Sequence, residues 1–245
     1  MTNAVVLAID AGNTRVKWGV HAGDSWRASG AVATTEVDTL DTALAAAPRA
    51  AVAIACNVAG DPVQASIARA CAAAGLEAAF IRSPRAQLGV VNGYRDPQRL
   101  GPDRWAALVA AHALEKGHKL VVNAGTALTI DALTADGKFL GGLIVPGPAL
   151  MRRSLDRGTA GLRLTEGAFS EFPQGTPDAI TSGAIQACCG AIERLAHAMV
   201  SHGSAPVRIV LSGGAAGEIA PRLTLPVTHN ENLVLDGLVL IARHP

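Results

Sequence analysis

The first twenty residues contain two apolar runs separated by a polar turn. "VVLAI" at 5–9 leads into "DAGNT" at 10–14, and apolar residues then alternate with other residues over 16–20. Alternation with a period of two indicates a strand, and a Gly-Asn turn between two such runs indicates a hairpin. The sequence therefore predicts a hairpin whose first strand ends on the carboxylate of Asp10.

The same pattern returns in the middle of the chain. In "KLVVNAGTALTIDAL", residues 119–133, a short apolar run is followed by Asn-Ala-Gly-Thr and then by a second apolar run. A polar residue, alanine, glycine and threonine occur at nearly the same offsets in both places, which indicates an internal duplication. We therefore predict two similar α/β halves, 1–117 and 118–245. Coincidence is the alternative, because the match is short.

Apolar residues spaced three and four apart predict helices elsewhere, and short apolar runs predict further strands. The expected helices are 38–47, 62–74, 103–117, 179–200 and 233–243, and the expected strands are 50–56, 79–82 and 207–211. Residues 139–151 are expected to form a strand and a glycine-rich turn that enters a helix. Residues 90–102, rich in Gly, Pro, Asn and Asp, are expected to form a loop.

Charge and composition narrow the classes of partner. The chain of 245 residues carries 21 Lys and Arg against 20 Asp and Glu, without a long basic run, so binding to nucleic acid is not expected. The pair Arg152-Arg153 is interpreted as solvated surface or as an anion contact. No apolar segment approaches the ~20 residues that cross a bilayer, and no secretion signal is recognisable, so membrane insertion is not expected.

The spacing of cysteine and histidine residues predicts no transition-metal site. Cys56, Cys71, Cys188 and Cys189 have no Cys-x-x-Cys spacing, and the seven histidines form no His-Glu-x-x-His cluster. We expect the cysteines to be reduced and to pack as small apolar side chains. Together with the absence of a secretion signal, this predicts a cytoplasmic protein.

The two polar turns have the residue types that bind phosphate. Gly12 lets backbone N–H groups approach phosphate oxygens closely, and Asn13 and Thr14 add neutral donors. Asp10 can hold Mg²⁺ or its waters, and Lys17 adds a positive charge. Two such hairpins facing one another would bind the triphosphate of a nucleotide. The alternative is a pair of ordinary hairpins, although the other common nucleotide motifs are missing from the sequence.

The paired turns resemble those of the superfamily that contains actin, sugar kinases and acetate kinase. Within it, "IDAGNTRVKW", "GYRDPQRLGPDRWAA", "NAGTALTID", "GGLIVPGPALM" and "GTPDAITSG" occur in the order found in type III pantothenate kinases, over about residues 7–240. The resemblance implies two ribonuclease-H-like domains, each a mixed sheet with flanking helices. It also implies ATP-dependent phosphorylation of pantothenate, the first step towards coenzyme A, by a homodimer that uses Mg²⁺ and K⁺ or NH₄⁺.

Residue roles follow from the same resemblance. Asp103 matches the general base that acts on the pantothenate hydroxyl, although an aspartate at a helix start is also a good N-cap. Arg104 matches the arginine that binds the substrate carboxylate, and Tyr94 and Gly101 match other residues of the pantothenate pocket. Thr176 resembles the threonine that reaches into the neighbouring protomer's site.

The phosphate-binding residues also correspond by position. The first motif comprises Asp10, Asn13, Thr14 and Lys17, and the second comprises Gly125 and Thr126. The turn Ser212-Gly213-Gly214 resembles the glycine motif on the adenosine side. Gly141 and Gly142 are expected to shape a loop beside the pantothenate pocket.

One position departs from the family pattern. The family usually has Asp where this chain has Asn123, and that carboxylate is associated with the monovalent cation or the phosphate region. Asparagine keeps an oxygen ligand but removes the charge, so the affinity for the cation should fall. We expect Asp131 to be a strand-end residue that faces solvent, with compensation for the lost charge as the alternative.

Two rival functions remain open at the level of sequence. Another small-molecule kinase of the superfamily would share both turns but would not need the Tyr94 and Arg104 pair. A non-catalytic, nucleotide-binding regulatory protein could also keep these motifs. The presence of Asp10, Asp103 and Arg104 favours an enzyme over the regulatory protein.

Overall fold

The computed structural model describes residues 4–159 and 166–244, which form two compact units. Unit 1 comprises Met1–Glu115 together with Asn232–Pro245, and unit 2 comprises Lys116–Glu231. The division after Glu115 lies two residues before the boundary expected at 117. The structure corrects the other end of the second half, because residues 232–244 pack with unit 1.

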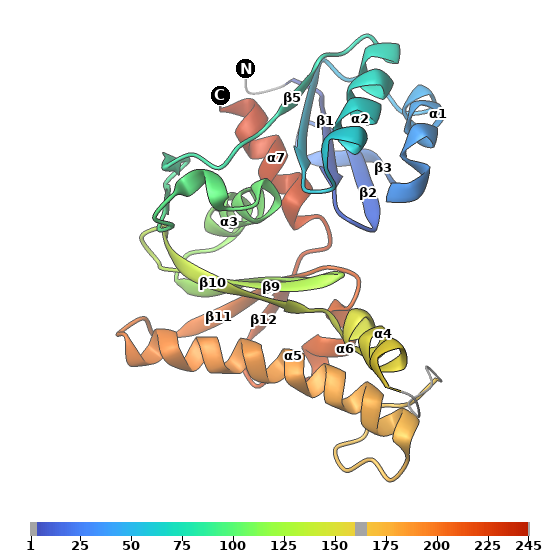
Figure 1. Cartoon of the computed structure of the whole chain (residues 1–245). Coiled ribbons are helices and arrows are strands. Elements are labelled where there is room, and N and C mark those ends of the chain that lie inside the picture. Colours follow the sequence, from blue (N-terminus) through green and yellow to red (C-terminus); the bar gives the residue numbers. More distant parts are fainter. Residues whose placement is uncertain (1–3, 160–165, 245) are drawn as a thin grey trace. The chain divides into compact units, whose positions relative to one another are not determined.

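Unit 1 is built on a five-stranded mixed sheet in the order β3-β2-β1-β4-β5 (Figure 1). β1 pairs antiparallel with β2, as the predicted hairpin requires, and β2 pairs antiparallel with β3, while β4 is parallel to β1 and to β5. The strands are β1 Val6–Ala11, β2 Arg15–Ala22, β3 Ser25–Ala33, β4 Val52–Asn57 and β5 Ala78–Phe80.

Helices pack against both faces of this sheet (Figure 1). η1 (Thr34–Thr39), α1 (Leu40–Ala45) and α2 (Asp61–Ala73) share a core with Leu7, Ile9 and Ala11 of β1. Because side chains alternate along a strand, Asp10 belongs to the opposite face. α3 (Pro102–Leu114) and α7 (Leu233–Arg243) pack together, and both contact β4.

The connection between β5 and α3 is more regular than predicted. It contains the antiparallel pair β6 (Ala86–Gln87) and β7 (Val90–Asn92), and the 3₁₀ turn η2 (Pro97–Arg99). Asn92 is buried and organises this segment, since its side-chain amide donates to the carbonyls of Pro84 and Pro97 at 3.2 Å each. The expectation of a plain loop over 90–102 is therefore wrong for its first residues.

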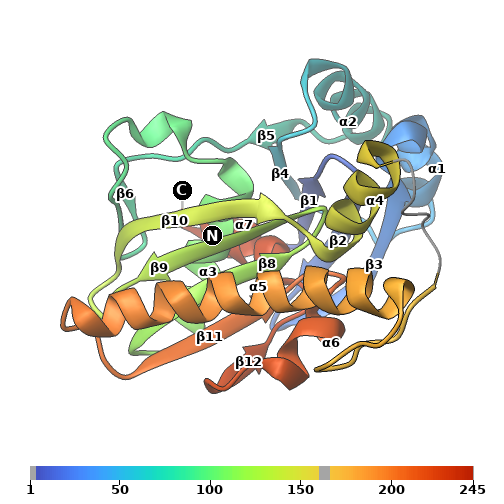
Figure 2. The ribbon, with the colours of Figure 1, turned by 60° about the horizontal axis from the view of Figure 1, so that its bottom comes forward.

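Unit 2 is built on strands in the order β12-β11-β8-β9-β10. β8, β9 and β10 are antiparallel neighbours, and β11 is parallel to β8 and to β12. α5 covers one face of this sheet (Figure 2) and packs on Leu120, Val122 and Ala124. The elements are β8 His118–Ala124, β9 Ala127–Leu133, β10 Lys138–Pro146, α4 Pro148–Gly158, α5 Thr176–Ser201, β11 Val207–Ser212, α6 Ala216–Ile219, η3 Ala220–Arg222 and β12 Val227–His229.

The two units repeat the same arrangement of strands. β8, β9, β10, β11 and β12 correspond in order and direction to β1, β2, β3, β4 and β5. The expected duplication is therefore confirmed at the level of the fold, which is α/β with two mixed sheets. Asp10 and Asn123 occupy equivalent positions, because each lies two residues before the glycine of its turn.

Candidate active site

Asp10 lies near the carboxyl end of β1, between residues of the two adjacent strands. In the strand register it is opposite Lys17 on β2 and Cys56 on β4. Residues opposite one another on adjacent strands share a face of the sheet. The Cys56 thiol donates to Oδ1 of Asp10 at 3.3 Å. Cys56, expected only as apolar packing, is thus a polar partner of a predicted site residue.

Asp103 lies in the first turn of α3, but it is not the N-cap. Gly101 is the N-cap, and the Asp103 carboxylate accepts from its own N–H and from the N–H of Arg104. A methyl group on Gly101 would stand 2.5 Å from Oδ1 of Asp103, so a residue without a side chain leaves room for the carboxylate. The capping alternative is therefore replaced by a carboxylate held inside the first turn.

The two carboxylates influence one another electrostatically. Burial raises the pKa of Asp103, and Arg104 and the backbone hydrogen bonds oppose that rise. Burial, and then the nearby charge of Asp103, raise the pKa of Asp10 to about 6, while the hydrogen bond from Cys56 and the charge of Lys17 lower it. Two carboxylates that repel one another in a buried site are chemically suited to a divalent cation, because the cation relieves the repulsion.

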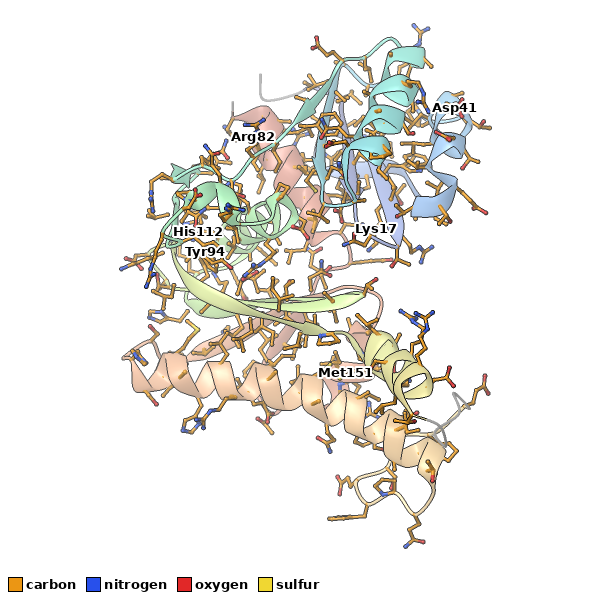
Figure 3. All side chains as sticks on the ribbon, viewed as in Figure 1. Lys17, Asp41, Arg82, Tyr94, His112 and Met151 are labelled. Carbon is orange, nitrogen blue, oxygen red and sulfur yellow. The ribbon has the colours of Figure 1, made fainter. Side chains whose placement is uncertain are left out.

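Arg104 and Tyr94 form a pair beside this carboxylate. The Arg104 side chain is buried, with 6% of the residue exposed, and one of its guanidinium nitrogens donates to the Tyr94 hydroxyl at 2.9 Å. Its central carbon lies 5.6 Å from the centre of the Tyr94 ring. Figure 3 shows Tyr94 on the segment that leads into α3. The structure therefore brings Arg104, the residue after Asp103, into direct contact with Tyr94, and the roles of these residues stay a prediction.

Backbone contacts fix the segment that carries Tyr94. Arg85 donates to the carbonyls of Asn92, Tyr94 and Arg95 at 3.2, 3.0 and 3.3 Å, and Oδ1 of Asn92 accepts from the Tyr94 N–H at 3.0 Å. Sequence reasoning missed Arg85 and Asn92, because their partners are backbone groups of the segment itself. A polar residue buried in an otherwise loop-like stretch is the signal that could have found Asn92.

The first turn presents its polar residues at the surface. The Gly12 N–H donates to the carbonyl of Arg15 at 3.0 Å, and Asn13 and Thr14 are exposed at the tip. Lys17 follows on β2, where Figure 3 labels it. Asp10, Lys17 and the turn residues therefore belong to one end of one hairpin in unit 1.

The second turn has the same closing bond but is one residue shorter. The Gly125 N–H donates to the carbonyl of Ala127 at 3.1 Å, and Thr126 is half-buried between them. Gly213, with φ of +98°, lies against the backbone of Ala124, where a methyl group would come within 2.5–2.7 Å. The Ser212-Gly213-Gly214 motif therefore supports the second turn directly.

Asp131 is placed differently from the expectation. It lies within β9 and is 1% exposed, so the prediction of a solvent-facing strand end is wrong. The strand continues to Leu133, and its alternation puts Asp131 on the same face as Thr129, the register partner of Asn123. A buried carboxylate therefore lies on the same face of the sheet as Asn123, two residues along β9 from its register partner.

Two other predicted residues are also accounted for. Thr176 is exposed and is the first residue of α5, after the N-cap Gly175. Gly141 and Gly142 lie inside β10, at a register irregularity after Phe139, and do not form a loop. The glycine at 141 has φ of +130°, which explains why a strand tolerates this irregularity there.

Sequence comparison assigns the chain to a family. The family model described as type III pantothenate kinase matches residues 6–198. The chain belongs to the type III pantothenate kinase family. A type III pantothenate kinase from Aromatoleum aromaticum is 45% identical over 239 residues, covering 98% of both chains. One from Nitrosospira multiformis is 43% identical over 241 residues, covering 98% of this chain and 92% of its own length.

Solved structures agree with the kinase fold of this family. A candidate 2-dehydro-3-deoxygalactonokinase from Sinorhizobium meliloti gives a TM-score of 0.64 at 18% identity, covering 97% of this chain and 98% of its own. A candidate Baf-family transcriptional activator from Campylobacter jejuni gives 0.60 at 21% identity, covering 97% of each. Within residues 4–159 and 166–244, no helix has the length and apolar character needed to cross a bilayer.

Proposed function

We propose that this kinase transfers the γ-phosphoryl group of ATP to the terminal hydroxyl of pantothenate in the cytoplasm, with Asp103 as the general base. The placement of the Asp103 carboxylate is the main support for this assignment of the base. The Asp103 carboxylate is held in the first turn of α3, has a raised pKa, and directly precedes the buried Arg104. A carboxylate with a raised pKa is a better proton acceptor for an alcohol that is losing its proton.

Positioning and electrostatics account for the rest of the reaction. Lys17 and the backbone N–H groups of the two turns, with Thr126 and Asn13, would hold phosphate oxygens of ATP. Asp10 would hold Mg²⁺ through its waters, and Mg²⁺ would neutralise charge at the phosphates. Burial, and then the charge of Asp103, raise the pKa of Asp10, and a bound cation would relieve both effects.

The alcohol substrate is recognised by the Arg104 and Tyr94 pair. The planar guanidinium of Arg104 can bind the carboxylate of pantothenate through two parallel hydrogen bonds. Tyr94 already accepts from Arg104, so it fixes the orientation of the guanidinium before the substrate arrives. Gly101 contributes by leaving space for the Asp103 carboxylate.

The Asp103→Asn variant tests the proposed base. We expect kcat to fall by roughly 10²- to 10⁴-fold, because general base catalysis contributes about that much. Binding of ATP and pantothenate should persist, which isothermal calorimetry would check alongside an ADP-release assay. Asp61→Asn is the matched control, because Asp61 is an exposed aspartate in the first turn of α2. A kcat near that of the wild type would remove Asp103 from this role.

The Arg104→Ala variant distinguishes a pantothenate kinase from a kinase that acts on another small molecule. Arg104→Ala should raise the KM for pantothenate strongly and leave the KM for ATP nearly unchanged. Arg99→Ala serves as the control, since the Arg99 side chain is 84% exposed. Unchanged pantothenate kinetics in the Arg104 variant would favour a different alcohol substrate. No ATP turnover by the wild type would favour the regulatory alternative.

The cation requirement and the assembly belong to the same proposal. Asn123 keeps an oxygen ligand without a charge, so we expect a weak dependence on K⁺ or NH₄⁺, with Asp131 on the same face supplying charge. Assays in Na⁺, K⁺ and NH₄⁺ would measure this dependence.

A homodimer in which Thr176 completes the neighbouring site is part of the same proposal. It is supported by exposed apolar residues of unit 2, including Ile144 and Phe172, which are 61% and 85% exposed.

A further inference from the structure

Both turns are closed by the residue that follows the third strand of their own unit. In unit 1 the N–H of Thr34, the first residue after β3, donates to the carbonyl of Thr14 at 3.0 Å. In unit 2 the N–H of Gly147, the first residue after β10, donates to the carbonyl of Thr126 at 2.9 Å. The same backbone bond therefore occurs at the same place in both copies of the fold.

The two turns differ in the residue that contacts the carbonyl of their glycine. The Thr34 hydroxyl donates to the carbonyl of Gly12 at 2.8 Å. In unit 2 the equivalent carbonyl, that of Gly125, lies so close to Gly147 that a methyl group there would overlap it. Unit 1 thus engages the glycine carbonyl with a hydroxyl, whereas unit 2 packs it directly against a glycine.

A second carbonyl of each turn accepts a hydrogen bond from a residue that follows β4 in unit 1 or β11 in unit 2. The carbonyl of Ala11 accepts from the N–H of Val58, just after β4, at 3.0 Å. The carbonyl of Ala124 accepts from the N–H of Ala215, three residues after β11, also at 3.0 Å. The alanine and threonine carbonyls of both turns are therefore engaged by neighbouring strands of their own unit.

Holding these carbonyls has a chemical consequence for an anion. Carbonyl and phosphate oxygens repel one another, whereas backbone N–H groups attract phosphate. A turn whose carbonyls are fixed by hydrogen bonds within the protein keeps its geometry without reorganisation when phosphate binds. The residues that engage the carbonyls therefore affect ATP binding without touching ATP.

We propose that Thr34 and Gly147 are the positioning residues of the two phosphate-binding turns, Thr34 through its hydroxyl and Gly147 through the absence of a side chain. This inference rests on the proposed function, in which the turns bind phosphates of ATP. Thr34 acts on Gly12 and Thr14, and Gly147 acts on Gly125 and Thr126.

Thr34→Val tests the first half, because valine keeps the shape and the backbone N–H but loses the hydroxyl. The KM for ATP should rise roughly 2- to 12-fold, which is the range expected for the loss of one hydrogen bond. The KM for pantothenate should stay unchanged, and Thr34→Ser should restore the KM for ATP. Thr39→Val is the control, since the exposed Thr39 hydroxyl donates to the Glu36 carbonyl at 2.8 Å on the same segment.

Gly147→Ala tests the second half. The added methyl group should displace the Gly125 carbonyl and raise the KM for ATP more than Thr34→Val does. Gly190→Ala in α5 is the matched control, because its methyl group meets no heavy atom outside its own helix within 4 Å. Where Gly147→Ala fails to fold, the Thr34 variants decide the inference. A Gly147→Ala protein that folds and binds ATP normally would overturn this half.

Lys17→Ala separates failure of this inference from failure of the proposed function. When Lys17→Ala raises the KM for ATP and Thr34→Val does not, the turn binds phosphate and the positioning role is wrong. When neither variant changes it, the phosphate-binding role of the turn is itself wrong. Equal increases in the KM values for ATP and pantothenate in Thr34→Val would indicate general destabilisation and would also overturn the inference.

Discussion

At the scale of single residues, the buried carboxylate of Asp10 has a cost for stability. Its pKa is raised to about 6 by burial and by the charge of Asp103. The native state therefore binds more protons than the unfolded chain between about pH 4 and pH 6. Across that range the contribution of Asp10 to the free energy of unfolding falls as the pH rises, and at pH 7 its charge opposes folding.

Asp10→Asn should therefore stabilise the protein while inactivating it. We expect the free energy of unfolding at pH 7 to increase by roughly 1–3 kcal/mol, because a neutral amide avoids the cost of a buried charge beside Asp103. The difference from the wild type should shrink as the pH falls from 6 to 4. Urea denaturation at several pH values measures both effects. A variant less stable than the wild type at pH 7 would contradict this explanation.

The polar partner of Asp10 could not have been predicted from the sequence. Cys56 is 46 residues away in the chain, and only the register of two parallel strands brings its thiol to the carboxylate. Motif spacing predicts roles for Asp10, Asp103 and Arg104 because family motifs keep those residues in short segments. The contact of Thr34 with the first turn could not be predicted for the same reason, because it depends on the pairing of β2 with β3.

At the scale of elements, α3 and α7 make a close contact one helical turn from Asp103. Gly237 of α7 packs on the backbone of Ala106 in α3, and a methyl group on Gly237 would overlap the Ala106 carbonyl. Ala106 follows Asp103 by three residues, so it lies one turn further along the same helix. A change in the distance between these helices would therefore move the Asp103 carboxylate.

Gly237→Ala should lower both stability and turnover. We expect a loss of roughly 1–3 kcal/mol in the free energy of unfolding, as for other overpacked core positions, and a lower kcat because Asp103 shifts with α3. Gly183→Ala in α5 is a suitable control, because its methyl group meets no heavy atom outside its own helix within 4 Å. Thermal unfolding and ADP release measure the two effects, and a fully active, equally stable variant would refute the coupling.

Elements with a strong apolar period were predictable, and those without one were not. The helix over 233–243 and the strands of both turn hairpins have continuous apolar faces, so their periods are clear. β3 is "SWRASGAVA", with alternate exposure and small residues, and its pattern is weak. β6 and β7 are two and three residues long, too short for any period to appear.

At the scale of the whole molecule, the duplication explains why both polar turns could be predicted from the sequence. The path of the chain explains why the end of the second half was predicted wrongly. Two copies of one strand order account for both polar turns and for the division after Glu115. The chain then returns at Asn232 and ends as α7 on unit 1. Local patterns identify α7 as a helix but do not specify which sheet it covers.

Residues at both ends of α7 bind the β2–β3 hairpin. The Trp26 indole N–H donates to Oδ1 of Asp236 at 3.0 Å, and Arg243 donates to the carbonyl of Gly23 at 2.9 Å. Arg243 also lies 3.1 Å from Nδ1 of His21. The helix is therefore attached to unit 1 by polar contacts in addition to its buried side chains.

Removing α7 should therefore prevent unit 1 from folding. A chain that ends at Glu231 loses six buried apolar side chains: Leu233, Val234, Leu235, Leu238, Val239 and Ile241. At about 1.5–3 kcal/mol each, their burial is comparable with the whole stability of a typical domain. We expect the truncated chain to be insoluble or to lack cooperative unfolding, whereas removal of residues 244–245 alone should have little effect. Adding a peptide of residues 232–245 should restore part of the cooperative transition, and a truncated chain that unfolds like the full one would show that unit 1 does not depend on α7.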